Sequence, residues 1–193
     1  MTWLLLATWI GTWGASPQPP IPGTIKTFNN QTIRLIVHTS AGGSNARIRI
    51  SNLYGDRPLV IGAAHIARRT TAADVDPATD RALTFRGNLS VTVAPGATAV
   101  SDAVAFEVPP LSDMAISLFF PQGTEAKTSH VLSKQTNYSS TPGNFVAEAT
   151  FPVASTFRLW PFLTGVDVER AKGATIVALG SSLTDGEIGR AHV

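Results

Sequence analysis

A serine at position 182 stands in a short turn of small polar residues, GSSLTDG, at residues 180–186. The turn follows the apolar run Ala174–Leu179, which is long enough for one buried strand. A serine at the carboxyl end of such a strand can direct its Oγ into the crevice above an open sheet, where ligands bind. Its own backbone N–H could then donate to a carbonyl oxygen that becomes an oxyanion. These residue types and their spacing suggest acyl transfer with Ser182 as the nucleophile.

The same turn also has an ordinary structural interpretation. Gly, Ser, Thr and Asp are common turn residues, and a polar turn between a strand and a helix needs no chemistry. On spacing alone this interpretation is favoured over the catalytic one. Glycines on either side of the serine would relieve strain in both cases, and in the catalytic case they would also let a substrate approach.

The residues before position 170 predict an all-β fold. In the stretch Ala46–Ser51 arginines alternate with apolar residues, which places Arg47 and Arg49 on one face of a strand and the isoleucines on the other. Such runs are separated by clusters of Gly, Pro and Asn, which is typical of an antiparallel sandwich or barrel. The other expected strands are 33–38, 59–67, 82–85, 89–93, 100–108, 114–120 and 156–162. We therefore expect a jelly-roll-like antiparallel β-sandwich over residues 8–170.

The pattern changes after residue 163. Residues 164–172 predict a polar connection, and the apolar run 174–179 that follows is continuous instead of alternating. Continuous apolar strands are typical of parallel sheets that are buried on both faces. We therefore place a domain boundary near residue 170 and expect residues 171–186 to begin an incomplete α/β domain.

Composition and charge exclude several kinds of function. The 193 residues include 15 Lys and Arg against 13 Asp and Glu, a formal net charge of +2. This charge is too small and too dispersed to attract a phosphate backbone, so nucleic acid is not an expected partner. The absence of cysteine excludes disulfides and thiolate metal sites. Because His38, His65 and His130 have no second ligand at metal spacing, we expect neither a metal nor another cofactor.

Residues 1–7 are expected to be the remnant of an export signal. The start of the chain, MTWLLLATWI, is apolar, lacks a positively charged segment and leads directly into strand-like sequence. Its apolar run is far below the roughly 20 residues that a membrane helix needs, so we expect no membrane span. The expected location is outside the cell.

Residues 176–186, IVALGSSLTDG, resemble the first block of the SGNH or GDSL hydrolases, in which an apolar strand precedes Gly-Asp-Ser and then Thr-Asp-Gly. The upstream sequence agrees. WIGTWGASPQ at residues 9–18, the stretch 30–67 and FRLWPFLTGVDV at 157–168 resemble the β-sandwich that precedes the catalytic domain in a bacterial subgroup of these esterases. The resemblance implies a secreted carboxylic ester hydrolase, esterase or lipase, whose α/β domain is flavodoxin-like. It covers nearly the whole chain up to Gly186.

The resemblance assigns roles within the turn. Ser182 matches the nucleophile, and its main-chain N–H matches one donor of the oxyanion hole. Ser181 stands where the family usually has aspartate, which puts the rigidity of the turn in doubt more than the reaction. Asp185 matches the aspartate of the block and is expected to stabilise the turn. The remaining supporting residues of the turn are Gly180, Thr184 and Gly186.

The rest of the family's machinery has no counterpart in these 193 residues. Its other oxyanion donors come from a separate glycine and a Gly-x-Asn-Asp block, its base comes from a late Asp-x-x-His, and neither block is present. A serine without its base is a weak nucleophile, so this chain is expected to be close to inert. Residues 187–193, EIGRAHV, match the translation of a sequencing-library adapter and are expected to be a non-native tail. We therefore expect the N-terminal fragment of an enzyme that cleaves a small ester or an acylated carbohydrate through an acyl-enzyme.

The alternative is a non-catalytic β-sandwich that binds carbohydrate or cell-wall polymer. Trp3, Trp9, Trp13 and Trp160 could form a platform on which sugars stack. Large aromatic residues dominate protein cores, so packing within or between domains is the simpler explanation of these tryptophans. The two arginines of strand 46–51 could likewise meet an anionic ligand, but a solvated face is the ordinary explanation.

Overall fold

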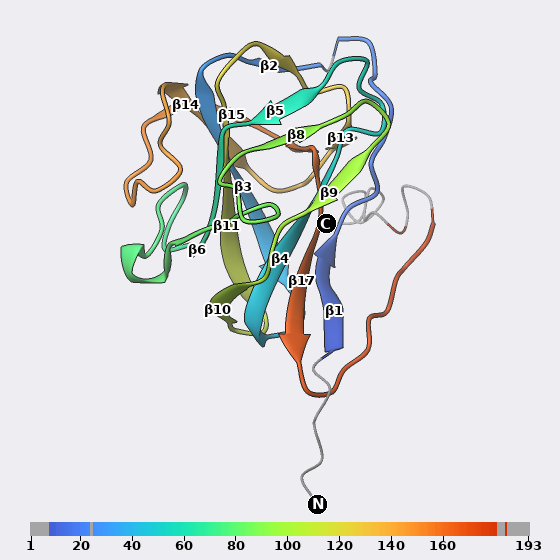
Figure 1. Cartoon of the computed structure of the whole chain (residues 1–193), viewed down its shortest axis with the longest axis vertical. Coiled ribbons are helices and arrows are strands. Elements are labelled where there is room, and N and C mark those ends of the chain that lie inside the picture. The colour runs from blue at the N-terminus through green and yellow to red at the C-terminus, as the bar shows by residue number, and fades with distance from the viewer. Residues whose placement is uncertain (1–7, 24, 181–183, 185–193) are drawn as a thin grey trace, which may run out of the picture.

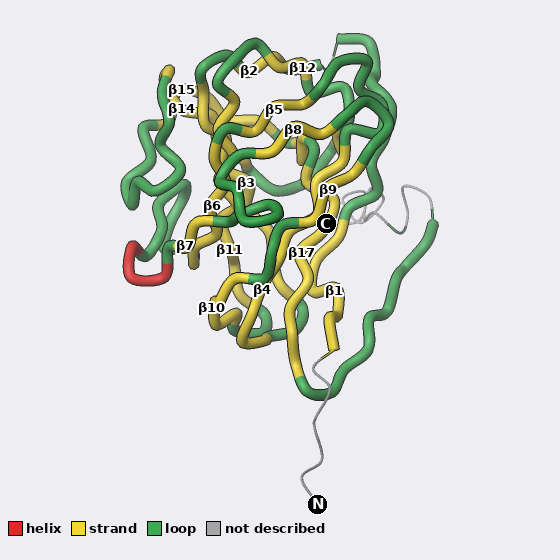
Figure 2. Tube along the Cα trace, viewed as in Figure 1, coloured by secondary structure: helices red, strands yellow, loops and turns green. Residues whose placement is uncertain are grey.

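The computed structural model describes residues 8–23, 25–180 and 184, which form an antiparallel β-structure (Figure 1). Strands and loops make up nearly all of these residues, and the one helical turn among them is η1 at Pro77–Thr79 (Figure 2). The strands form two large sheets, and apolar side chains from both sheets share one core. The expectation of a mainly β, antiparallel sandwich is confirmed.

The first large sheet, called the β17 sheet, contains five antiparallel strands in the order β1–β17–β4–β10, with β9 also paired to β4. Its strands are β1 (Thr8–Gly14), β17 (Leu163–Arg170), β4 (Gly43–Ser51), β10 (Val104–Val108) and β9 (Thr98–Val100). The first and the last strand of the fold therefore lie next to each other (Figure 1).

The second large sheet, called the β11 sheet, has the order β15–β14–β3–β11–β6–β7. Its strands are β15 (Val153–Phe157), β14 (Asn137–Pro142), β3 (Gln31–Thr39), β11 (Ser112–Phe120), β6 (Ala63–Arg68) and β7 (Arg81–Ala82). Three smaller sheets pair β2 (Thr27–Phe28) with β12 (Thr124–Glu125), β5 (Leu59–Ile61) with β8 (Val91–Val93), and β13 (Ser129–Val131) with β16 (Leu159–Pro161).

The predicted alternation in β4 accounts for the core between the large sheets. Ala46, Ile48 and Ile50 are fully buried, and they belong to the same cluster as Ile116 and Leu118 of β11. Removing a large aliphatic side chain from water contributes roughly 1.5–3 kcal/mol. The apolar face of each alternating strand therefore holds the two sheets together.

The strands β3 and β11 are buried on both faces. On the outer side of the β11 sheet, Ile36 and Ala115 join a second apolar cluster with Val75 from the β6–β7 loop and Phe151 from the β14–β15 loop. These two loops cover the middle of the outer face of the sheet, so the central part of β3 and β11 is buried on both sides.

The structure corrects the prediction that residues 164–172 form a polar connection. Residues up to Arg170 form β17, which pairs with β1 on one side and β4 on the other. Val166 and Val168 are fully buried, whereas Asp167 points to the opposite face and is also buried. The prediction was wrong because the carboxylate of Asp167 is neutralised by arginines of β4, which a local pattern does not reveal.

The segment Ala174–Leu179, predicted to begin an incomplete α/β domain, forms no strand in the described structure. The segment runs back beside β1 without forming a backbone ladder (Figure 1). Its link to β1 is the Thr175 hydroxyl, which accepts from the Gly11 N–H at 2.8 Å and lies 3.3 Å from the Gly11 carbonyl oxygen. Ile176, Val177 and Leu179 are 96%, 80% and 95% exposed. A buried parallel strand needs neighbours on both edges and cover on both faces, and the described residues provide neither.

The predicted strands 33–38 and 114–120 lie within β3 and β11, whereas the remaining predictions agree with the structure only in part. The predicted strand 59–67 is divided at Gly62 into β5, which pairs with β8, and β6, which pairs with β11. A Cβ atom at Gly62 would lie 2.9 Å from Cδ1 of Phe119. The predicted strand 100–108 is divided into β9 and β10. The predictions 82–85, 89–93 and 156–162 overlap the shorter strands β7, β8, and β15 with β16.

Asn137 joins three strands from a fully buried position, and its replacement tests this packing. Its Oδ1 accepts from Ile36 N at 2.7 Å, and its Nδ2 donates to the Leu159 carbonyl oxygen at 2.8 Å. We expect Asn137→Ala to lower the free energy of unfolding by about 2–3 kcal/mol, because a buried N–H and a buried carbonyl lose their partners. Urea unfolding measures the change. The control is Asn29→Ala at an exposed side chain, and equal unfolding midpoints for the two variants would contradict the expectation.

Candidate functional site

The turn that the sequence predicts to be catalytic lies largely outside the described residues. Ser181, Ser182, Asp185 and Gly186 are among the residues that are not described, whereas Gly180 and Thr184 are. A Cβ atom at Gly180 would collide with the hydroxyl and the Cβ of Thr184. Position 180 therefore needs glycine for the chain to fold back in this way.

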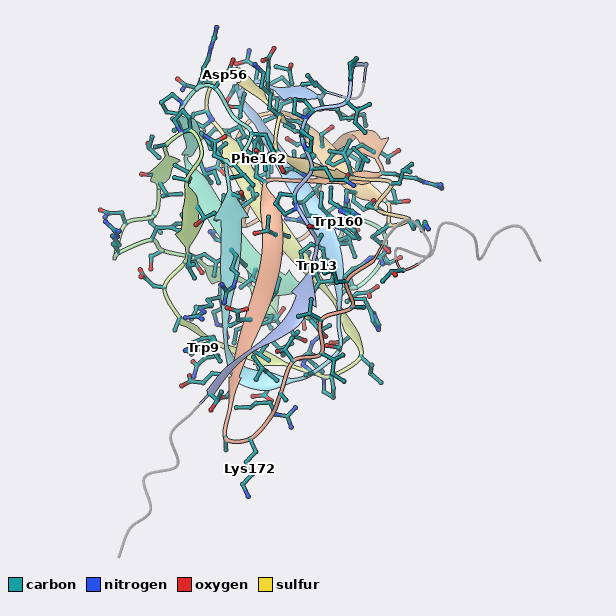
Figure 3. All side chains as sticks on the ribbon, turned by 90° about the vertical axis from the view of Figure 1, so that its right-hand side faces the viewer. Trp9, Trp13, Asp56, Trp160, Phe162 and Lys172 are labelled. Carbon is teal, nitrogen blue, oxygen red and sulfur yellow. The ribbon has the colours of Figure 1, made fainter. Side chains whose placement is uncertain are left out.

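Gly180 and Thr184 line a recess of about 620 Å³ together with Ala178 and Leu179, and its other described walls come from the sandwich. The sandwich contributes Trp13, Trp160 and His130, and we call the hollow the Trp13–Trp160 recess. Figure 3 shows Trp13 and Trp160 close together on one side of the molecule. The recess thus brings Gly180 and Thr184 next to aromatic residues that are far from them in the sequence.

Trp13 is placed by an irregularity in β1. The pairing of β1 with β17 shifts register between Gly11 and Trp13, which is the mark of a β-bulge. Thr12 anchors the bulge, because its hydroxyl donates to the Ala41 carbonyl oxygen at 2.6 Å and accepts from Ala41 N at 2.9 Å. The bulge therefore sets the direction in which the Trp13 side chain extends from β1.

Trp160 is held by the core of the sandwich. Its Nε1 donates to the Ile36 carbonyl oxygen at 3.1 Å, and its ring meets that of Trp13 edge to face, with centroids 4.9 Å apart and planes at 72°. Such pairs contribute about 0.5–1.5 kcal/mol beyond the area that they bury. Both rings are half-buried, so each keeps part of its surface for other contacts.

His130 and Gln18 complete the sandwich side of the recess. His130 Nδ1 lies 2.9 Å from the Ser16 carbonyl oxygen, and because a carbonyl only accepts, this nitrogen carries a proton. The imidazole centroid is 5.9 Å from that of Trp160. Gln18 pairs with Ser129 through the backbone, and its Oε1 accepts from Val131 N at 3.0 Å. These contacts fix the orientation of both side chains.

The described lining of the recess carries no carboxylate, ammonium or guanidinium group. It consists of aromatic, aliphatic, amide, hydroxyl and backbone groups, together with the His130 imidazole. Sequence reasoning treated His130 as an isolated histidine and did not single out Gln18. No local signal connects these residues to Trp13, since they come from separate elements of the fold.

The tryptophans do not form one platform. Trp9 lies under the guanidinium of Arg47, which is 4.3 Å from its ring centroid, and Trp3 is not among the described residues. Arg47 Nε donates to Asp167 Oδ2 at 2.9 Å, and Arg49 Nη2 is 2.7 Å from the same oxygen. Both arginines therefore neutralise a buried carboxylate, and their face is neither simply solvated nor directed at a free anion.

The other two histidines in the described part of the chain form separate pairs with aspartates. His38 Nδ1 lies 2.8 Å from Asp113 Oδ1, and His65 Nδ1 lies 2.7 Å from Asp80 Oδ2. Over the described ranges no three metal-binding side chains of His, Asp or Glu lie together. The first pair links β3 to β11, and the second links β6 to the residue just before β7.

Asp113 provides an expected pH dependence. Burial opposes ionisation of its carboxyl, but hydrogen bonds from His38 and Arg69 outweigh burial and hold its pKa below the ordinary value. A pKa that is lower in the folded state stabilises the fold at neutral pH, and the contribution is lost as the pH falls below about 4.

We expect Asp113→Asn to flatten the acid side of the stability curve, by less than about 1 kcal/mol because the pair is partly exposed. Urea unfolding between pH 3 and pH 7 measures the curve. Glu107→Gln is the control, since this carboxylate is exposed and makes no hydrogen bond to the described part of the chain. An unchanged curve for Asp113→Asn would show that the pair has no such role.

No protein-family model matches this sequence, and no curated protein sequence matches it. Within the described residues, no helix is both long enough and apolar enough to cross a bilayer.

Proposed function

We propose that this chain carries the first catalytic block of a secreted serine ester hydrolase of the SGNH or GDSL type, with Ser182 as its nucleophile. The block IVALGSSLTDG at residues 176–186 supports the proposal, because it follows a β-sandwich in the order that the resemblance implies. The observation that carries it is the exposure of Ile176, Val177 and Leu179, whereas the apolar strands β3 and β11 of the described sandwich are buried. Such a segment is suited to be the strand of a further sheet.

In the proposed reaction, Ser182 Oγ attacks the carbonyl carbon of an ester while a histidine accepts the hydroxyl proton. The backbone N–H of Ser182 donates to the carbonyl oxygen as it gains negative charge. The tetrahedral intermediate collapses, the same histidine protonates the alcohol that leaves, and an acyl-serine ester remains. Water activated by that histidine then attacks the acyl group and releases the acid. The proposal requires a histidine and an orienting carboxylate that these 193 residues do not contain as Asp-x-x-His.

Covalent trapping tests the proposed nucleophile. The full-length gene product that contains this chain is treated with a fluorophosphonate, digested and analysed by mass spectrometry. We expect one adduct on the peptide that contains Ser182, because an activated serine reacts with phosphonylating agents much faster than an ordinary hydroxyl. Prior denaturation of the protein should abolish the labelling. Labelling of another serine, with Ser182 unmodified, would overturn the assignment.

A second candidate is a binding module for carbohydrate or cell-wall polymer without catalysis. One observation favours it: half-buried Trp13 and Trp160 border a recess of about 620 Å³. Sedimentation with insoluble polysaccharides distinguishes the two candidates. Retention of the chain, together with no ester hydrolysis by the full-length gene product, would favour the binding module.

A further inference from the structure

We infer that the Trp13–Trp160 recess binds the neutral sugar ring of an acylated carbohydrate, and that this recess selects the substrate of the proposed hydrolase. The claim that the recess selects the substrate rests on the proposed function. The claim that the recess binds a sugar ring does not.

The aromatic surface of the recess favours a sugar ring. The Trp160 indole is anchored through Nε1 to Ile36, and the Trp13 indole is packed against it edge to face. Their orientations are therefore set before a ligand arrives, which lowers the entropic cost of binding. A half-buried indole offers a flat apolar face of the size of a pyranose ring, whose C–H groups form a matching apolar side.

The hydrogen-bonding groups around the two indole rings also favour a sugar ring. Within the described ranges, three groups of the lining make no hydrogen bond: Gln18 Nε2, Ser16 Oγ and Trp13 Nε1. Two of these groups are N–H donors, and the third is a hydroxyl that can donate and accept. Sugar hydroxyls need partners of this kind around an aromatic face.

The described lining of the recess carries no charged side chain. Binding sites for phosphate or carboxylate groups usually contain Arg or Lys, and neither is among the described lining residues. A long acyl chain would leave Gln18 and Ser16 facing hydrocarbon, which costs free energy for each polar group without a partner. The volume of about 620 Å³ lies within the usual range for small-molecule sites. A neutral sugar ring satisfies all three conditions.

The recess also adjoins the segment after β17. Gly180 and Thr184, which stand on either side of residues 181–183 in the sequence, line the recess together with the tryptophans. A sugar ring held by the sandwich would therefore contact Gly180 and Thr184, which flank the proposed nucleophile in the sequence. The sandwich would thus recognise the sugar while the other domain cleaves its ester.

Chemical-shift mapping tests the binding. The 193-residue chain is labelled with ¹⁵N and titrated with methyl 6-O-acetyl-β-D-glucopyranoside, with glucose 6-phosphate as the charged comparison and ethyl hexanoate as the acyl comparison. We expect the Nε1–H signals of Trp13 and Trp160 to move with the acetylated glucoside, and the Trp9 signal to remain in place. Movement with the phosphate or the acyl ester alone, or no movement of the Trp13 signal with the glucoside, would overturn the inference.

Matched variants extend the test to the full-length gene product. We expect Trp13→Leu to weaken binding of the glucoside at least tenfold and to raise KM for its hydrolysis, whereas Trp9→Leu changes either quantity less than twofold. Equal effects of the two variants would count against the recess. Binding at the recess without any ester hydrolysis would overturn the proposed function and leave this inference standing. Hydrolysis through Ser182 without binding at the recess would overturn this inference and leave the proposed function standing.

Discussion

Replacing Ser182 by alanine in the full-length gene product is expected to lower kcat/KM for p-nitrophenyl acetate by a factor of at least about 10³. The substitution removes the Oγ that forms the acyl-enzyme and keeps the backbone N–H that would donate to the oxyanion. The residual rate would then reflect binding and oxyanion stabilisation alone, which still exceed the reaction in water. Release of p-nitrophenol measures the rate.

The neighbouring serine provides the matched control for this change. Ser181→Ala alters the same turn by one hydroxyl, at the position where the SGNH or GDSL block usually has aspartate. We expect this variant to retain kcat/KM within about tenfold. Equal losses for the two variants would indicate damage to the turn and not loss of a nucleophile. Unchanged hydrolysis by Ser182→Ala would end the esterase proposal.

Replacing Arg34 by methionine is expected to lower the free energy of unfolding by about 3–5 kcal/mol. Arg34 lies on β3 at the centre of the outer face of the β11 sheet, and its side chain is fully buried. Nε donates to Ser117 Oγ at 2.9 Å, Nη1 to the Ala73 carbonyl oxygen at 2.8 Å, and Nη2 to the Glu148 carbonyl oxygen at 2.9 Å. The guanidinium also lies 4.4 Å from the ring centroid of Phe151.

Arg34 stays positively charged although its side chain is buried. Removal from water lowers its pKa to about 10, and the nearby carboxylates of Asp80, Asp74 and Glu148 oppose the decrease. The side chain is therefore a cation at neutral pH, and its hydrogen bonds to carbonyl oxygens are charge-assisted. Those carbonyls belong to the β6–β7 and β14–β15 loops, so one side chain holds both loops on the sheet.

The expected loss has a specific cause. Methionine would fill much of the space, but the buried Ala73 carbonyl and Ser117 hydroxyl and the partly buried Glu148 carbonyl would lose their donor. Arg34→Lys keeps the charge and loses the planar fork, so we expect an intermediate loss. Chemical denaturation followed by fluorescence measures all variants. Arg158→Met at an exposed position is the control, and a difference of less than about 1 kcal/mol between it and Arg34→Met would contradict this role.

Local patterns were sufficient to predict the strands that build the core. The alternation in Ala46–Ser51 identified both faces of β4, and the runs 33–38 and 114–120 fall within β3 and β11. Side-chain direction along a strand depends only on the two-residue period of an extended backbone. Turn residues between the runs then indicated antiparallel sheets, and the sandwich followed from these two short-range properties.

Whether a charged residue is buried or exposed depended on contacts between segments that are distant in the sequence. Arg34 stands in an alternating run and would be assigned to a solvated face, yet two loops cover it. Asp167 made its segment resemble a connection until Arg47 and Arg49 were placed beside it. The free energy of burying a charge depends on which partners reach it, and the partners are set by the fold.

The same distinction separates the two parts of the candidate site. The nucleophile was proposed from one continuous block of sequence, because a strand and the turn after it position a serine locally. The Trp13–Trp160 recess combines β1, β13, β16 and the segment after β17, and no period or motif links these elements. A strand can be recognised from a few neighbouring residues, whereas a recess exists only once the sheets have packed and brought its walls together.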